Sequence, residues 1–333
     1  MAASGKPSIC IVSPGTARDN NGNWHTADRW AHFLRGDYDI VIQERWSEQW
    51  PAPDLLIALH ARRSAPSLAD FRRHYPDRPA LLVLTGTDVY HDIHHDAEAE
   101  GALALADALV VLQPAALDEL PDAIRPNAHV IYQSAEALAP LPGLPGRQDI
   151  TMAGHLRGVK DPATFMRAAA LVKAPDVFMQ HIGAALDADL GRLAERTAAD
   201  LEHYAWLGGA SRELTRDCIR RSHALAICST MEGGANVIVE AITSGVPVLA
   251  SDISGNRGML GDGYAGFFPA GDAAALARLI DRSVQDGAFL ATLRAQCAAR
   301  VPLFAPEAER AALLALVDNL LPSTPRHPIG KKT

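Results

Sequence analysis

The chain has few cysteines and no surplus of positive charge, and each shortage excludes a class of protein. Its 333 residues include only four cysteines, none in a Cys-x-x-Cys spacing, and Cys10 and Cys228 lie inside apolar runs. Reduced thiols in a buried core, in a reducing compartment, are therefore expected. The formal net charge of -8 argues against a nucleic-acid partner, because binding to phosphate backbones depends on a surplus of Lys and Arg.

Long apolar runs and membrane-docking features are missing as well. The first residues carry no basic segment followed by an apolar stretch, and no later run approaches the roughly eighteen apolar residues of a membrane span. No Lys-rich amphipathic helix with aromatic anchors is visible that would hold the chain at a bilayer. We therefore expect a soluble, cytoplasmic protein without a membrane partner, whose oligomeric state the sequence leaves open.

What the chain does contain is an alternation of short apolar runs with segments of helical period, in each of its halves. This alternation predicts βαβ units and parallel sheets. Candidate strands begin at Ser8, Asp39, Leu55, Ala80, Ala108 and His129, and again at Asp149, Val177, Tyr204, Ala224, Val246 and Gly266. Because the chain is long for a single core, we expect an α/β protein of two Rossmann-like, doubly wound parallel-sheet domains with a cleft between them.

A segment rich in proline and glycine, residues 138–148, separates the halves, and neither a helix interior nor a central strand accepts such a segment. We place an N-terminal domain over residues 1–143 and a C-terminal domain over residues 144–305. A C-terminal helix is expected over residues 306–321. The basic, proline-containing residues 322–333 are expected to be a disordered tail.

The stretch over residues 228–252 carries the densest set of candidate chemical groups. A strand is expected to end there and a helix to start near residue 235, with free backbone amides available to an anion. Glycines let such a backbone approach its ligand closely. The backbone positions expected to bind are Gly233, Gly234, Ala235, Asn236 and Val237.

Two glutamates, Glu232 and Glu240, stand in this stretch with seven residues between them. Carboxylates on either side of a diphosphate would accept hydrogen bonds from the hydroxyls of a sugar and a ribose. The alternative is structural: Glu232 would be an acid favoured by the helix dipole, and Glu240 a solvated helix residue.

Two cations, Arg157 and Lys160, follow the first expected strand of the second half, at the carboxyl edge where α/β sheets bind ligands. They could hold a diphosphate and stabilise a leaving nucleotide. The alternative is that both are solvated loop residues.

The first half offers two loops for a second substrate. The loop after the first strand is a polar turn expected to lead into a helix capped near Asn23 to Thr26, unless it is an ordinary Asn-Gly surface turn. Another loop, residues 84–96, follows a strand and carries Asp88, a candidate base or a group that positions the acceptor. The candidates for acceptor binding are Arg18, Asn20, Asn21, Gly22, Asn23, Thr26, Gly86 and Thr87.

No metal or other cofactor is expected. His91, His94 and His95 stand close together, but no carboxylate or cysteine completes a tetrahedral set by spacing. Asp187 and Asp189 are predicted at the start of a helix rather than at a strand end that could present them to a divalent ion. The phosphates would be neutralised by the two cations instead.

The segment MEGGANVIVEA, with SGVPVLASD after it, resembles the Glu-x7-Glu signature of the family 4 glycosyltransferases, which have the GT-B fold and are grouped as retaining. AGHLRGVKDP is similar to the family's segment whose basic pair contacts the donor phosphates. The resemblance implies donor contacts at Gly208 and Gly209, whose loop packs against the base, and at Gly15, where the family has a Gly-rich loop. The face on which the acceptor arrives is left open.

Together with NNGNWHTADRW and LTGTDVY, these segments resemble most the selenosugar synthases of selenoneine biosynthesis, over nearly the whole chain. The resemblance implies a UDP-sugar donor, UDP-N-acetylglucosamine or UDP-glucose, and selenophosphate as the nucleophile. A carbon–selenium bond would form, with release of UDP and phosphate. The alternatives are a conventional GT-B transferase with a hydroxyl or thiol acceptor, and a nucleotide-sugar-binding protein without turnover.

Overall fold

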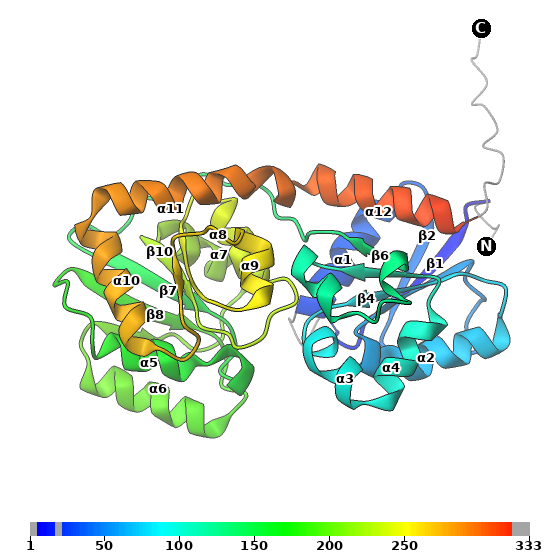
Figure 1. Ribbon diagram of the computed structural model, residues 1–333, viewed down its shortest axis with the longest axis horizontal. Helices are drawn as coiled ribbons and strands as arrows, with labels where there is room; N and C mark the ends of the chain where they lie inside the picture. Colours follow the sequence, from blue (N-terminus) through cyan, green and yellow to red (C-terminus); the bar gives the residue numbers. More distant parts are fainter. Residues whose placement is uncertain (1–4, 17–21, 322–333) are drawn as a thin grey trace, which may run out of the picture. The chain divides into compact units, whose positions relative to one another are not determined.

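The computed structural model describes residues 5–16 and 22–321, and these fall into two compact units. Unit 1 comprises the chain up to Val111, residues 120–131, and the chain from Glu309 onward. Unit 2 comprises residues 112–119 and 132–308. The chain therefore passes from unit 1 into the main part of unit 2 between residues 131 and 132. The boundary expected from the sequence lies later, between residues 143 and 144. Each unit contains one six-stranded sheet within the described residues (Figure 1).

The sheet of unit 1 has the strand order β2-β1-β3-β4-β5-β6, and all of its strand pairs are parallel. Its strands are β1 (Ser8–Val12), β2 (Asp39–Gln43), β3 (Leu55–Leu59), β4 (Ala80–Leu84), β5 (Ala108–Val111) and β6 (Ala128–Val130). The central strands β3 and β4 are buried at every position. Their unbroken apolar sequences suit a parallel sheet that is covered on both faces.

The helices of unit 1 follow its strands in the order expected for crossover connections. They are α1 (Gly22–Leu34), α2 (Ala61–His74), the π-helical turn η1 (Asp88–Asp92), α3 (Ile93–His95), α4 (Ala97–Leu105) and η3 (Arg125–Asn127). The last helix, α12 (Pro306–Leu320), joins this unit through the buried Glu309. Glu309 accepts hydrogen bonds from Arg29 Nε (2.7 Å) and Trp30 Nε1 (2.7 Å), so α12 is attached to α1.

The sheet of unit 2 has the order β12-β11-β10-β7-β8-β9 and is also parallel. Its strands are β7 (Gln148–Ala153), β8 (Val177–Ile182), β9 (Tyr204–Trp206), β10 (Ala224–Ile227), β11 (Val248–Ser251) and β12 (Phe267–Phe268). A strand occurs at each of the twelve places expected from the sequence. The predicted fold class, two doubly wound parallel-sheet domains, is confirmed.

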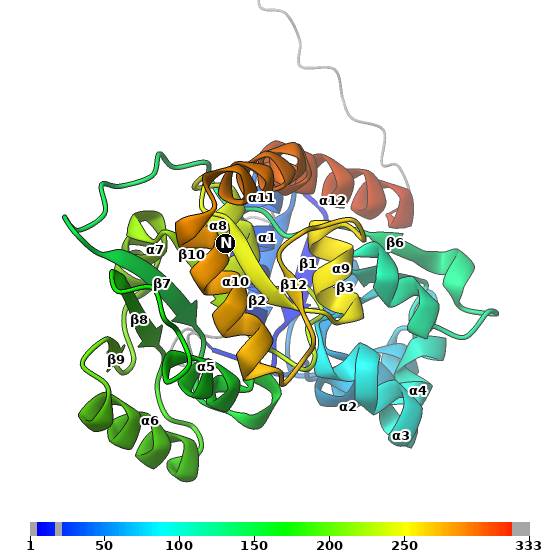
Figure 2. The same ribbon diagram turned by 60° about the vertical axis from the view of Figure 1, so that its left-hand side comes forward.

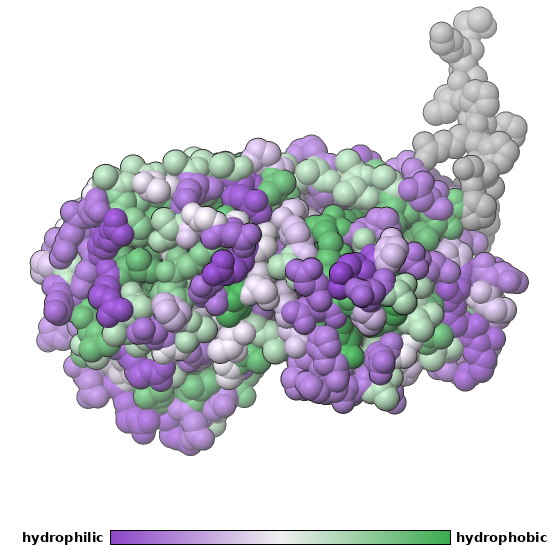
Figure 3. All heavy atoms as spheres, viewed as in Figure 1, coloured by the Kyte–Doolittle hydropathy of each residue, from purple (hydrophilic) through white to green (hydrophobic). Residues whose placement is uncertain are grey.

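Helices cover the sheet of unit 2, and α5 packs against α10 (Figure 2). They are α5 (Pro162–Ala169), α6 (Ala188–Asp200), α7 (Arg212–Arg221), α8 (Asn236–Ile242), α9 (Ser254–Leu260), α10 (Ala273–Gln285) and α11 (Gly287–Arg300), with the short 3-10 turns η2 (Pro114–Glu119), η4 (Gly158–Lys160) and η5 (Val301–Phe304). Hydrophilic side chains cover the outer face of α6 (Figure 3).

The cysteines and the helix lengths bear on two further expectations. All four cysteines are free thiols, and three of them, Cys10, Cys228 and Cys297, are buried in the two cores, as expected. Burial raises the pKa of the Cys10 thiol to about 12, so it is an inert core residue. No helix in the described parts of the chain combines the length and apolarity needed to cross a membrane.

Candidate functional site

Three loops meet at the carboxyl ends of β7, β10 and β11, which are neighbours in the sheet of unit 2. The backbone amide of Thr230, after β10, donates to the carbonyl of Val159, after β7, at 3.0 Å. Ser251 Oγ, at the end of β11, donates to the carbonyl of Ser229 at 2.5 Å. This is the edge at which parallel α/β sheets bind ligands. The three loops therefore form one candidate site within unit 2.

An ion pair between Lys160 and Glu232 lies at the centre of these loops. Lys160 Nζ donates to Glu232 Oε1, and Ser229 Oγ donates to the same oxygen at 2.6 Å. The Glu232 residue is 7% exposed. A buried carboxylate requires such partners, because desolvation without them is costly. The structure thus brings together the predicted Lys160 and Glu232.

The backbone of Glu232 is fixed by the first turn of α9, which the sequence analysis did not include. A Cβ atom at Gly255 would lie 1.9 Å from the carbonyl oxygen of Glu232, so only glycine fits there. Asn256 Nδ2 donates to the carbonyl of Ser251 at 2.9 Å and is completely buried. The available signal was a glycine four residues beyond the end of a strand, because glycine often marks a close backbone approach.

The glycine-rich segment before α8 has a packing role. A Cβ atom at Gly234 would lie 2.7 Å from the Cβ of Leu112, so this glycine admits a neighbouring side chain of the same unit. Ala235 is the N-cap of α8, as predicted, and Asn236 and Val237 are half-buried in its first turn. Contact of these backbone positions with a donor stays a prediction.

The loop after β7 carries a concentration of positive charge. Burial, followed by the charges of Arg157 and Lys160, lowers the pKa of His155. Its Nδ1 accepts a hydrogen bond from the amide of Ala184 at 3.1 Å. Arg157 is exposed, and its guanidinium forms no ion pair with the described residues. Asp161 ends the loop at φ +40° and accepts from the amide of Thr164, so the position of this basic segment is fixed by the start of α5.

The second predicted carboxylate, Glu240, lies on α8 and is 6% exposed, so it is not the solvated helix residue of the alternative interpretation. Its Oε1 contacts Arg212 Nε, in the first turn of α7, at 3.3 Å. Sequence reasoning missed Arg212, because the pairing joins two helices and no local pattern reports it. A buried acid with a partly exposed cationic partner is available to a polar ligand that displaces the cation.

The weaker donor candidates lie in the loop after β9. Gly208 has φ +70°, and its carbonyl accepts from the amide of Gly183 at 2.7 Å, which ties this loop to the one after β8. A Cβ at Gly209 would contact Ala184 at 3.4 Å. The positive φ explains why residue 208 is a glycine. Packing of Gly208 and Gly209 against the base of a nucleotide stays a prediction.

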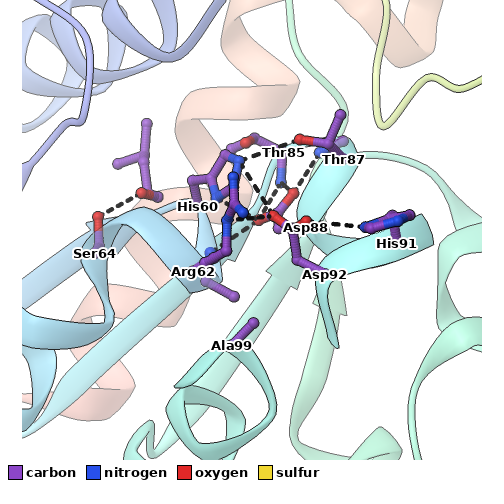
Figure 4. Close-up of polar contacts among 12 residues, drawn as sticks. His60, Arg62, Ser64, Thr85, Thr87, Asp88, His91, Asp92 and Ala99 are labelled. Atoms are coloured by element: carbon purple, nitrogen blue, oxygen red, sulfur yellow. Dashed lines mark hydrogen bonds and ion pairs between the residues drawn. The ribbon is translucent and has the colours of Figure 1, made fainter. Parts of the chain in front are cut away.

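In unit 1 the structure does not support Asp88 as a base. The Asp88 side chain is fully buried, and its carboxylate accepts hydrogen bonds from the backbone amides of Ala61 (3.0 Å), Thr85 (2.9 Å) and Gly86 (2.7 Å) (Figure 4). These bonds join the loop after β4 to the first residue of α2. A carboxylate occupied in this way positions Gly86 and Thr87 instead of removing a proton from a substrate.

His60, which sequence reasoning missed, lies between β3 and α2 in an unusual backbone conformation. Its φ of 73° is rare for a residue with a side chain, and such strain concentrates at functional sites. The ring is buried, and its Nε2 is 3.2 Å from Thr87 Oγ1 (Figure 4). Burial lowers the pKa of His60, with Asp88 offsetting part of this effect. The only signal was a polar residue directly after a buried strand.

The loop after β1 is described in part. Arg18, Asn20 and Asn21 lie outside the described residues. Gly15 is buried, and its carbonyl accepts from Ser13 Oγ at 2.8 Å.

The predicted cap near Asn23 to Thr26 is wrong, because α1 already begins at Gly22. Gly22 and Asn23 therefore stand in the first turn of this helix. Thr26 is fully buried and donates from Oγ1 to the carbonyl of Gly22 at 2.9 Å. Its side chain is therefore not exposed, as a residue that binds the acceptor substrate would be.

The histidine-rich run and the Asp pair were considered above as metal candidates. The rings of His91 and His95 lie 4.9 Å apart, and no group of three or more His, Cys, Asp or Glu residues in the described chain is arranged to hold a metal ion. Asp187 caps α6 by accepting from the amides of Asp189 (2.9 Å) and Leu190 (3.2 Å), so the predicted helix start is confirmed.

The chain is similar to known glycosyltransferases in sequence and in fold. Residues 141–301 match the family model described as glycosyl transferases group 1. Glycosyltransferase 1 domain-containing protein 1 of Xenopus tropicalis is 26% identical over 204 residues, which cover 55% of this chain and 59% of that protein. The chain thus spans less than two thirds of this curated relative.

Among solved structures, sucrose-phosphate synthase from Thermosynechococcus elongatus has a TM-score of 0.77 at 17% identity, covering 95% of this chain and 99% of that one. HepE of Anabaena, solved in complex with UDP and glucose, has a TM-score of 0.74 at 16% identity, covering 93% of this chain and 99% of that one. At these identities the likeness shows the fold alone. The protein has the GT-B fold, and its residues 141–301 are similar to the glycosyl transferases group 1 family.

Proposed function

We propose that this protein is a glycosyltransferase that binds a UDP-sugar at the carboxyl edge of the sheet in unit 2. The observation that carries the proposal is the buried pair of Lys160 and Glu232 beside the exposed Arg157, within loops joined by hydrogen bonds. A diphosphate needs cations and a sugar needs hydrogen-bond acceptors, and this edge offers both. HepE, of the same fold, has been solved with UDP-glucose bound.

The residues take distinct roles in this proposal. Lys160 and Arg157 neutralise the diphosphate and the charge that develops on the leaving UDP. Lys160 carries three N–H donors, so it contacts a phosphate oxygen while it keeps its bond to Glu232. Glu232 then accepts from sugar hydroxyls, and Glu240 accepts from the ribose after Arg212 moves away. No metal ion is required for this neutralisation.

We further propose selenophosphate as the acceptor, on the resemblance of four sequence segments to the selenosugar synthases. Selenium attacks the anomeric carbon, and the bond from that carbon to the UDP oxygen breaks with its electron pair leaving on UDP. Water then cleaves the selenium–phosphorus bond and phosphate is released. The occupied carboxylate of Asp88 supports this choice, because an acceptor that is already anionic needs no general base.

A conventional transfer to a hydroxyl is the second candidate, and the contact between His60 and Thr87 favours it. Burial lowers the pKa of His60, which favours the neutral ring, the form that can accept a proton. A hydroxyl acceptor would need such a base, whereas selenophosphate would not.

The deciding experiment measures UDP release from UDP-N-acetylglucosamine and from UDP-glucose, each with and without selenophosphate, with products identified by mass. Release that depends on selenophosphate and yields a selenium-bearing sugar supports the full proposal. Release with hydroxyl or thiol acceptors alone would leave a UDP-sugar transferase and remove the selenium chemistry. Binding of UDP-sugar without release under any condition would overturn the enzyme assignment and indicate a binding protein.

A further inference from the structure

A pocket of about 450 Å³ opens at the amino edge of the sheet in unit 2, away from the three loops described above. Its wall includes Gln148, the first residue of β7, His223, directly before β10, and Pro247, directly before β11. We call it the amino-edge pocket. Its volume lies in the range of sites for small molecules, roughly 300 to 1,000 Å³.

The strands themselves separate this pocket from the nucleotide-sugar site. β7 runs from Gln148 in the pocket wall to Ala153, just before the loop that carries Arg157 and Lys160. A parallel strand rises about 3.3 Å per residue, so the two ends of β7 are roughly 16 Å apart. A ligand in the pocket therefore does not touch the residues proposed to bind the sugar nucleotide.

Four arginines line the amino-edge pocket: Arg147, Arg220, Arg221 and Arg294. Two of them are held in place by the protein. Arg147 Nε is 2.5 Å from the buried carboxylate of Asp149, and its guanidinium lies 3.8 Å from the centre of the Phe178 ring.

Arg220 donates to the carbonyl of Ala139 at 2.9 Å and pairs with Asp217 at 2.8 Å. Anchored guanidinium groups lose less freedom when they bind an anion, so they favour binding.

The other two arginines have no such contacts. The guanidinium groups of Arg221 and Arg294 form neither a hydrogen bond nor an ion pair within the described chain, and both residues are exposed. The charge of Arg294 acts on His223 in the pocket wall. Burial lowers the pKa of His223, the carbonyl of Ser283 opposes this, and Arg294 lowers the pKa further.

The net charge of the pocket is positive although the whole chain carries -8. Four guanidinium charges less the carboxylate of Asp149 leave a surplus of three, and counting Asp217 as well leaves two. Helix α7 ends at Arg221 and contributes about half a negative charge from its dipole. The surplus exceeds what is needed to neutralise this helix end.

We propose that the amino-edge pocket binds the phosphate group of a small molecule, as a site separate from the nucleotide-sugar site. Guanidinium groups match phosphate oxygens with two parallel hydrogen bonds, and Arg221 and Arg294 have these donors available. Inorganic phosphate and the phosphate of a monoester share this chemistry.

Isothermal titration at constant ionic strength tests the proposal on the full chain, with inorganic phosphate and with glucose 6-phosphate as probes. We expect saturable binding of at least one probe, weakened about tenfold by Arg221→Gln and by Arg294→Gln, because each variant removes a charge-assisted bond. Tighter binding of the ester assigns the site to a phosphorylated metabolite. Equal binding of both probes assigns it to phosphate itself.

Two control variants locate the binding. Arg278→Gln removes an exposed arginine of α10 in the same unit, away from the pocket wall, and should leave the affinity unchanged. Lys160→Gln alters the nucleotide-sugar site and should also leave it unchanged. The proposal is overturned if neither probe binds at millimolar concentration or if Arg278→Gln weakens binding as much as the pocket variants. Loss of binding in Lys160→Gln, with the pocket variants unaffected, would also overturn it.

Discussion

Lys160 and Glu232 form an ion pair although 72 positions separate them in the sequence, and the pair joins the loop after β7 to the loop after β10. Glu232 neutralises the cation that we assign to the donor diphosphate. In the proposal above, the donor diphosphate contacts a lysine that already has its carboxylate partner and keeps it. This arrangement lowers the desolvation cost of binding, because Glu232 is buried and Lys160 is largely so before the donor arrives.

Replacing Lys160 by alanine should lower kcat for UDP release at least about 100-fold, since the cation acts on the charge of the leaving diphosphate. The comparison is Lys173→Ala, an exposed lysine of the same unit, which should retain wild-type turnover. Steady-state kinetics over a range of UDP-sugar concentrations measures kcat and KM. Turnover that survives in Lys160→Ala would remove Lys160 from the mechanism.

Glu240→Ala should act on the donor affinity and leave kcat within a few-fold of wild type. The loss of a charge-assisted hydrogen bond to the ribose should raise KM for UDP-sugar roughly tenfold. Arg212→Ala removes the cation that pairs with Glu240 in the free protein, and should lower KM or leave it unchanged. A fall in kcat without a change in KM for Glu240→Ala would contradict the assignment.

His60 is expected to position Thr87, and its strained backbone allows a test that separates folding from function. At φ 73° glycine is favoured over alanine by about 1 kcal/mol, so His60→Gly should be more stable to urea than His60→Ala. Both variants should lose turnover, because each removes the ring that contacts Thr87 Oγ1.

Thr87→Val should cause a similar loss of turnover, and the double variant His60→Gly with Thr87→Val should add little to it. Full additivity in this cycle would show that the two residues act separately. Urea unfolding of all four proteins serves as the control for folding.

The strands could be predicted from the sequence because buried parallel strands appear as unbroken apolar runs, such as LLIAL over Leu55–Leu59 and ALLVL over Ala80–Leu84. The loops that follow these strands lie at one edge of a sheet by topology alone. The sequence was therefore sufficient to place Lys160 and Glu232 at a shared edge. Their direct contact could not be predicted, because it depends on the positions of two side chains.

Other features depend on backbone geometry or on tertiary contacts that no local pattern reports. After β4 the backbone turns so that the Asp88 carboxylate accepts hydrogen bonds from three backbone amides. A residue expected to act on a substrate therefore has a structural role. The pairing of Arg212 with Glu240 joins two helices. Helix α1 begins at Gly22 and not at the expected cap, and Thr26 is buried within this helix.

The last prediction concerns acid stability and depends on His181 in β8. Burial lowers its pKa to about 4, with the carbonyl of Gly154 opposing the shift through a contact at 3.1 Å. The unfolded chain has an ordinary histidine pKa near 6.5. Between about pH 6.5 and 4 it therefore binds a proton that the folded protein does not bind. The neutral ring stabilises the fold fully above about pH 6.5, and this contribution is lost as pH falls toward 4, by about 3 kcal/mol in all.

Urea unfolding at pH 7.5 and at pH values down to 4.5 should show wild type losing more stability than His181→Phe, whose ring can keep the contact with Phe165. Equal losses in the two proteins would mean that His181 takes up its proton without unfolding.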